Sequence, residues 1–325
     1  MTDVRASEAR TARAPGRRRR PLVAAVLAIG MVVGAACAPG PAQPPTGPGS
    51  NTPCGRTDVR LTNPSVADAI YVSYPTGTAA VPTTGGTCGD ASRPVLFLVH
   101  GYLANSNALY EGVINHFTRA GHIVVMGTYA TDIANVQASA DRALQAITAA
   151  VPQLEREDLS RVGLVGHSLG GGMLPWVTQQ VVARGWGGSG LWMFSLAPYQ
   201  RIGTGTITLP AHARAAVEAY DQDTLVNRAV GIDIHRSLSL PAARKDHITV
   251  RTSSHGGATL TAQHTSPNSL IAPEDGIKFF GIYRVGDLLS TCALRGTSCD
   301  ADLSTMGTWP DGTPVLPSIV TDDPT

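Results

Sequence analysis

A serine stands between two glycines at residues 166–170, which read Gly-His-Ser-Leu-Gly. The short apolar run 161–165 precedes this pentapeptide, and apolar residues at helical spacing follow from Leu169 onward. A G-x-S-x-G pattern between a strand and a helix is typical of a nucleophile elbow, a sharp turn that presents a serine hydroxyl at the end of a sheet. Glycines suit both flanks because a Cβ would clash where strand and helix approach each other. We therefore predict that Ser168 is a nucleophile.

A serine hydroxyl is a weak nucleophile, so it needs a neighbouring base that a third group orients. After an elbow of this kind, the acid comes next along the chain and the histidine comes last. A predicted strand at 215–220 leads directly into Asp221 and Asp223. Either carboxylate could orient the base.

Four histidines follow the two aspartates, and an imidazole can take up and return a proton near neutral pH. They are His235, His247, His255 and His264. We expect His255 to be the base, because it directly follows the predicted strand 248–252 and precedes two glycines in a mobile loop. His264 is the alternative. The other two do not follow the last predicted strand.

The tetrahedral intermediate of acyl transfer needs two N–H groups that face its oxyanion. Leu169 offers one, because it begins the helix after the serine, where unpaired amides and the helix dipole favour negative charge. The loop after the apolar run 95–99 reads His-Gly-Tyr, and we expect the Tyr102 amide to be the second donor. His100 precedes the nucleophile in the chain and is expected to be structural.

Short apolar strands alternate with helical stretches along the chain. Strands are predicted at 69–74, 95–99, 122–126, 161–165, 191–195, 215–220 and 248–252, and helices at 107–120, 136–154, from 169, and at 273–289. This alternation predicts an α/β fold with a mostly parallel, doubly wound sheet and helices on both faces. Site residues are then expected directly after strands, at the carboxyl edge of the sheet.

The N-terminal region has the layout of an export signal. The basic cluster 17–20 precedes an uncharged apolar run at 21–36, which is shorter than the roughly 20 residues that a membrane span needs. We predict that residues 1–37 are this signal. The sequence Gly-Ala-Ala-Cys at 34–37 is similar to a lipoprotein cleavage box, so a lipid anchor at Cys37 and simple secretion both remain open.

Residues 38–52 are rich in Pro and Gly and are predicted to be a linker, which leaves 53–325 for a single large α/β domain. Without residues 1–37 the chain has 18 basic and 22 acidic side chains, a balance that argues against a nucleic-acid partner. No histidine–carboxylate spacing typical of a metal site and no dinucleotide or phosphate-binding motif stands out. We therefore expect no cofactor and no metal, and we expect a monomer.

Four cysteines follow Cys37, and an even number in an exported chain favours two disulfides. They are Cys54, Cys88, Cys292 and Cys299. Sequence order favours pairing the first with the second and the third with the fourth.

Together these motifs resemble the α/β-hydrolase superfamily, and more closely the secreted bacterial cutinase-like esterases, which include polyester hydrolases. Residues 166–172, Gly-His-Ser-Leu-Gly-Gly-Gly, are similar to that family's Gly-His-Ser-Met-Gly-Gly-Gly. Ala-Pro-Tyr at 197–199 is similar to its Ala-Pro-Trp, and Tyr102 takes its aromatic oxyanion position. The sequence departs from the family at Leu169, where methionine is usual, and at His100, where the polyester hydrolases usually have proline.

The resemblance implies a function and one more site residue. Residues 223–226, Asp-Thr-Leu-Val, resemble the acid loop of many secreted members, which favours Asp223 over Asp221. The implied protein is a secreted or surface-anchored serine ester hydrolase (carboxylesterase, lipase or cutinase-like) that works through an acyl-enzyme. A non-catalytic binding protein on the same scaffold and an amide hydrolase are the alternatives.

The expected site is open. Superfamily members with a cap usually insert it before the acid strand, and 199–215 is too short for a helical cap. An open apolar cleft suits hydrophobic or polymeric esters, and Trp176 could equally belong to the core. The residues expected to line the cleft are Tyr102, Leu169, Trp176 and Tyr199.

Overall fold

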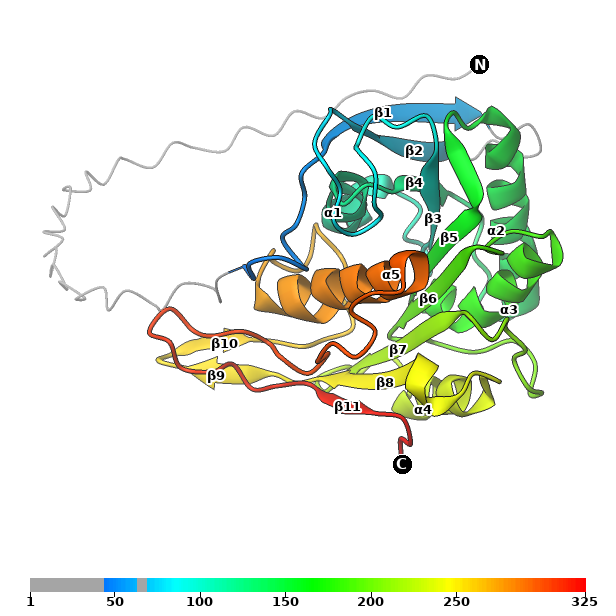
Figure 1. Ribbon diagram of the computed structural model, residues 1–325. Helices are drawn as coiled ribbons and strands as arrows, with labels where there is room; N and C mark the ends of the chain where they lie inside the picture. Colours follow the sequence, from blue (N-terminus) through cyan, green and yellow to red (C-terminus); the bar gives the residue numbers. More distant parts are fainter. Residues whose placement is uncertain (1–43, 63–68) are drawn as a thin grey trace, which may run out of the picture. The chain divides into compact units, whose positions relative to one another are not determined.

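A nine-stranded mixed sheet forms the centre of the computed structural model, which describes residues 44–62 and 69–325 (Figure 1). The sheet order is β1-β2-β4-β3-β5-β6-β7-β8-β11. The six strands from β4 to β8 in this order are parallel, and β1, β2 and β11 are antiparallel to their neighbours. The bounds are β1 (Gly55–Thr62), β2 (Ala69–Thr76), β3 (Arg93–Val99), β4 (Ile123–Gly127), β5 (Glu157–His167), β6 (Gly190–Leu196), β7 (Arg214–Tyr220), β8 (Lys245–Val250) and β11 (Ile319–Thr321).

Helices cover both faces of this sheet, as the alternating pattern predicted. On one face lie α2 (Val136–Ala150), α3 (Leu169–Ala183) and α4 (Arg228–Ser237). On the other lie α1 (Glu111–Arg119), the π-helical segment η4 (Ile277–Arg284) and its continuation α5 (Val285–Arg295). Short 3₁₀ turns are η1 (Asn107–Tyr110), η2 (Val151–Gln153) and η3 (Ala242–Arg244).

The central strand β3 shows how one apolar run supplies both cores. Successive side chains of a strand point to opposite faces. Val95 and Phe97 accordingly join the core under α2 and α3, whereas Leu96 and Leu98 join the core under α1 and α5. A strand buried on both faces must be apolar throughout, which is why this run was recognisable in the sequence.

The chain after β8 differs from the prediction. The predicted last strand at 248–252 is β8, and it is followed by the antiparallel hairpin of β9 (Ser253–His255) and β10 (Ala258–Leu260). The prediction of a mobile loop at His255 is therefore wrong, because His255 lies in β9 and pairs with Ala258. The closing helix ends at Arg295 instead of Leu289.

Both predicted disulfides form, Cys54–Cys88 and Cys292–Cys299. Structural disulfides persist in oxidising compartments, so the pairs fit an extracellular or similarly oxidising environment. Within 44–62 and 69–325, no helix is both long and apolar enough to cross a membrane. The predicted export signal, 1–37, and the anchor site Cys37 lie outside the described residues.

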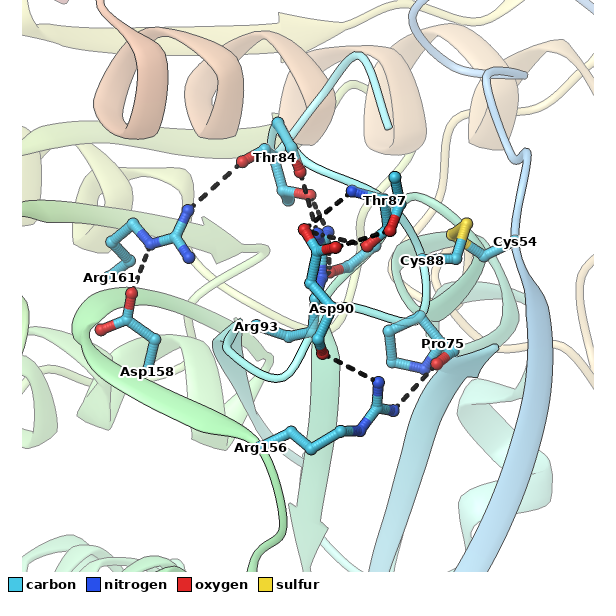
Figure 2. Close-up of polar contacts among 12 residues, drawn as sticks. Cys54, Pro75, Thr84, Thr87, Cys88, Asp90, Arg93, Arg156, Asp158 and Arg161 are labelled. Atoms are coloured by element: carbon cyan, nitrogen blue, oxygen red, sulfur yellow. Dashed lines mark hydrogen bonds and ion pairs between the residues drawn. A yellow bond between two sulfur atoms is a disulfide. The ribbon is translucent and has the colours of Figure 1, made fainter. Parts of the chain in front are cut away.

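Figure 2 shows how the loop between β2 and β3 is fixed at the amino end of β3. In the buried guanidinium of Arg93, Nε donates to the carbonyl oxygen of Gly121 and Nη1 donates to that of Thr87, each at 2.9 Å. Burial lowers the pKa of Arg93 to about 10, while the Asp90 carboxylate favours its charged form. The Cys54–Cys88 disulfide joins this loop to the residue before β1, so the loop is fixed at both the start of β1 and the start of β3.

Candidate active site

Ser168 occupies a strained turn between β5 and α3. Its backbone has φ 57° and ψ −118°, a combination that a non-glycine residue rarely adopts. The Ser168 N–H donates to the carbonyl of Leu196, at the end of neighbouring β6. A Cβ at Gly170 would overlap the carbonyl oxygen of Val99, and one at Gly166 would stand 2.6 Å from the carbonyl oxygen of Gly170. The two glycines of the motif are thus required by backbone contact.

The Ser168 hydroxyl is hydrogen-bonded to His264, and His264 to Asp223. The Ser168 Oγ lies 2.9 Å from His264 Nε2, and His264 Nδ1 lies 2.8 Å from Asp223 Oδ2. Ser168 and His264 are each 9% exposed, so the serine is sheltered but reachable. With the ring neutral, Nδ1–H donates to the carboxylate and Nε2 accepts the serine proton. An arrangement of this kind can activate a serine hydroxyl as a nucleophile.

Asp223 is held in its charged form by several donors. Burial alone would raise its pKa, but the hydrogen bond from His264 and the N–H groups of Leu225 and Val226 outweigh that effect and lower the pKa. Those two N–H groups donate to Oδ1 at 2.8 and 3.1 Å, which leaves Oδ2 for the imidazole. A permanent carboxylate can stabilise an imidazolium that forms beside it.

His255 does not contact Ser168, so the prediction that His255 is the base is wrong. Its Nε2 lies 2.6 Å from Asp311 Oδ2, and its ring lies 5.9 Å from that of Trp309. The physical reason is the hairpin after β8, because pairing with β10 directs His255 toward the C-terminal segment that carries Asp311. The alternative, His264, takes the place beside Ser168.

Asp221, the alternative acid, has a different partner. Its two oxygens accept hydrogen bonds from the backbone and side chain of Thr252, both at 2.8 Å. The same Thr252 hydroxyl accepts from the Ala262 N–H, and the Ala262 carbonyl accepts from Gln222. Asp221 therefore holds Thr252 at the start of the hairpin segment, and Thr252 and Gln222 hold Ala262 at its end, two residues before His264.

The loop after β3 packs against Ser168. A Cβ at Gly101 would lie 3.2 Å from Ser168 Cβ, and the turn that follows includes Leu103 with φ 56°. Tyr102 lies in this turn with 46% of its surface exposed. Leu169 begins α3, where the first N–H groups of a helix have no acceptor within it. Of the predicted oxyanion donors, Leu169 thus directly follows Ser168, and Tyr102 directly follows the glycine that packs against Ser168.

His100, the first residue after β3, is buried and has structural contacts. Its Nδ1–H donates to the Gly101 carbonyl at 2.8 Å, and its Nε2 accepts from the Tyr129 N–H at 3.2 Å. The two rings stack with centroids 3.9 Å apart. Burial lowers the pKa of His100 to about 4, so the ring is neutral at ordinary pH.

The residues predicted to line the substrate cleft differ in how far they are buried. Trp176 is half-buried and packs against the core under α2 and α3, while Leu169 is fully buried. Tyr199 is half-buried, and its N–H donates to the Ser168 carbonyl at 2.9 Å. The segment 197–213 before β7 contains no helix.

Apart from Tyr102, sequence reasoning missed the following group of exposed apolar side chains. They lie in the loops after β3, β4 and β7 and in the segment after His264. Large apolar residues in segments that follow strands were the available signal. The group comprises Tyr102, Leu103, Ile133, Leu225, Leu270 and Ile271.

In 44–62 and 69–325 no group of three or more His, Cys, Asp or Glu side chains is placed to hold a metal ion. A scan against protein-family models finds no match to the chain, and a search of curated proteins finds no similar sequence.

Proposed function

We propose that this protein is a serine hydrolase that cleaves carboxylic esters through an acyl-enzyme. The observation that carries the proposal is the continuous relay from Ser168 Oγ to His264 Nε2, at 2.9 Å, and from His264 Nδ1 to Asp223 Oδ2, at 2.8 Å. The order serine, acid, histidine at the carboxyl ends of parallel strands supports assignment to the α/β-hydrolase fold. A scaffold kept only for binding would have no need of this alignment.

In the proposed reaction Ser168 Oγ attacks the ester carbonyl carbon and gives its proton to His264 Nε2. The Tyr102 and Leu169 amides stabilise the oxyanion of the tetrahedral intermediate. The C–O bond then breaks, and the alcohol leaves with the proton from His264. Water next attacks the acyl-enzyme while His264 accepts its proton, and collapse of the second intermediate returns that proton to Ser168. Asp223 stabilises the imidazolium in both halves.

The surroundings of the site support hydrophobic esters as the substrate class. Exposed apolar side chains stand on the loops after three strands, and 197–213 carries no helix that could form a cap. Exposed apolar side chains in these loops could contact an apolar acyl group. We propose a lipase- or cutinase-like esterase that is secreted or attached to the outer face of the cell membrane, with polymeric esters among its candidate substrates.

The test is hydrolysis of p-nitrophenyl esters from acetate to long-chain acyl groups. We expect turnover by the wild type, loss of at least about 10³-fold in kcat for Ser168→Ala, and near wild-type rates for Ser160→Ala at the opposite end of β5. Unchanged activity in Ser168→Ala contradicts the proposal. Turnover of anilides but of no ester indicates an amide hydrolase, and no turnover of either by folded protein indicates a binding protein.

A further inference from the structure

We propose that His167 and Tyr110 are positioning residues. They hold His264 and the loop that carries Tyr102 in place relative to Ser168. This inference rests on the proposed function, because it concerns the same site. Neither side chain takes part in the relay itself. Each makes contacts that connect two catalytic segments.

The contacts form one chain of hydrogen bonds behind the serine. The Gly101 N–H donates to the Tyr110 hydroxyl oxygen at 2.9 Å. The Tyr110 hydroxyl and His167 Nδ1 are 3.0 Å apart, and His167 Nε2 and the His264 carbonyl oxygen are 2.8 Å apart. This hydrogen-bond chain thus starts at Gly101, one residue before the proposed oxyanion donor Tyr102, and ends at the backbone carbonyl of His264.

Only one arrangement of protons satisfies every contact. The His264 carbonyl can only accept, so His167 must carry its proton on Nε2. Nδ1 is then an acceptor and takes the Tyr110 O–H, while the Tyr110 oxygen accepts from Gly101. A protonated His167 would have a donor at both nitrogens and could not accept from Tyr110.

The protein environment favours that neutral form. Burial lowers the pKa of His167 to about 3, and the nearby His264 ring, with centroids 4.9 Å apart, acts in the same direction. Tyr110 is fully buried, which raises the pKa of its hydroxyl and keeps it a donor. This hydrogen-bond chain therefore stays intact at ordinary pH.

His264 has particular need of such a contact. It follows β10 in a segment without helix or strand, so no regular element fixes its backbone. Its ring must nevertheless stay within hydrogen-bond distance of both Ser168 and Asp223. The bond from His167, the residue next to the nucleophile, ties the base directly to the elbow. A displacement of about 1 Å in such a site can cost ~10²-fold in rate.

The test uses three substitutions of His167 with kcat and KM measured separately. Phe removes both ring nitrogens, Gln can place an N–H near the position of Nε2, and Asn can place an acceptor near that of Nδ1. We expect His167→Phe to lower kcat by about 10- to 100-fold with KM within about twofold. We expect His167→Gln to recover most of this loss and His167→Asn to recover little.

His122→Phe is the matched control. His122 is also fully buried, with one ring nitrogen bonded to the Ser290 hydroxyl and one to the Phe117 carbonyl, but it precedes β4 at the opposite edge of the sheet. Its substitution should lower the melting temperature as much as His167→Phe while leaving kcat within about twofold, since only an effect on the site changes kcat. Equal kcat in His167→Phe and wild type, or equal losses in His167→Phe and His122→Phe, overturns the inference.

If His167→Phe does not fold, Tyr110→Phe tests the hydrogen-bond chain instead. It removes a single oxygen atom, and we expect kcat to fall by roughly 3- to 10-fold; an unchanged kcat contradicts the proposed chain. Labelling by a fluorophosphonate distinguishes a failure of the proposed function from a failure of this inference. A folded wild type that does not react overturns the proposed function and this inference with it. A wild type and a His167→Phe variant that react at the same rate overturn this inference alone.

Discussion

Asp221 and Asp223 are two residues apart, yet their carboxylates serve different segments. Asp223 turns inward to His264, whereas Asp221 accepts two hydrogen bonds from Thr252. The sequence placed both after a strand, and only the resemblance to known acid loops separated them. At the residue scale, the partner of each carboxylate decides its role.

The two aspartates should therefore respond differently to the same substitution. We expect Asp223→Asn to lower kcat by on the order of 10³–10⁴-fold, because an amide cannot stabilise the imidazolium or fix its tautomer. Asp221→Asn should keep kcat within a fewfold and lower the free energy of unfolding by about 1 kcal/mol, because it weakens the bonds to Thr252. Steady-state kinetics and urea denaturation of both variants check this. Comparable losses of kcat in the two would contradict the assignment.

At the scale of elements, the strands and helices that carry Ser168 were predictable because their patterns are local. The run 161–165 and the spacing after Leu169 reflect burial of β5 and α3, and the flanking glycines reflect contacts within one turn. The hairpin β9–β10 was not predictable in the same way. Its strands have three residues each, too few to show a period of two, and most of its side chains are not buried.

That hairpin explains why the base was misplaced. His255 comes closer to the end of β8 in the chain, so the rule that site residues follow strands favoured it over His264. The hairpin directs His255 toward Asp311 and returns the chain to Gln222, where the backbone contact with Ala262 brings His264 over the serine. These are contacts between segments distant in sequence, and a single sequence does not display them.

For the molecule as a whole, buried titratable groups tie stability to pH. Burial lowers the pKa of His100 and His247 to about 4 and of His167 to about 3. Burial raises the pKa of Glu218 well above its usual value, although the neighbouring Tyr220 hydroxyl acts in the opposite direction. The folded protein therefore keeps the histidines neutral and the carboxylic acid protonated.

The histidines and Glu218 change the free energy of unfolding with pH in opposite directions, so stability has a maximum at an intermediate pH. Between about pH 6.5 and 4 the unfolded chain binds more protons at the histidines, so stability falls as pH falls, by up to ~1.4 kcal/mol per pH unit for each. Above about pH 4.5 the folded chain holds the proton of Glu218 that the unfolded chain has lost, so that group lowers stability as pH rises. We expect Glu218→Gln to remove the second slope and stabilise the protein at pH 8, measured by urea denaturation from pH 4 to 9. A variant with the wild-type slope at high pH would refute this role for Glu218.

The measurement that tests the central claim most directly is covalent labelling by a fluorophosphonate, followed by peptide mass spectrometry. Three proteins are compared: wild type, His264→Ala and His255→Ala. The account predicts one adduct, on Ser168, forming at similar rates in wild type and His255→Ala and at least about 10²-fold more slowly in His264→Ala. An adduct on another residue, or a loss of labelling in His255→Ala but not in His264→Ala, would contradict the relay of Ser168, His264 and Asp223.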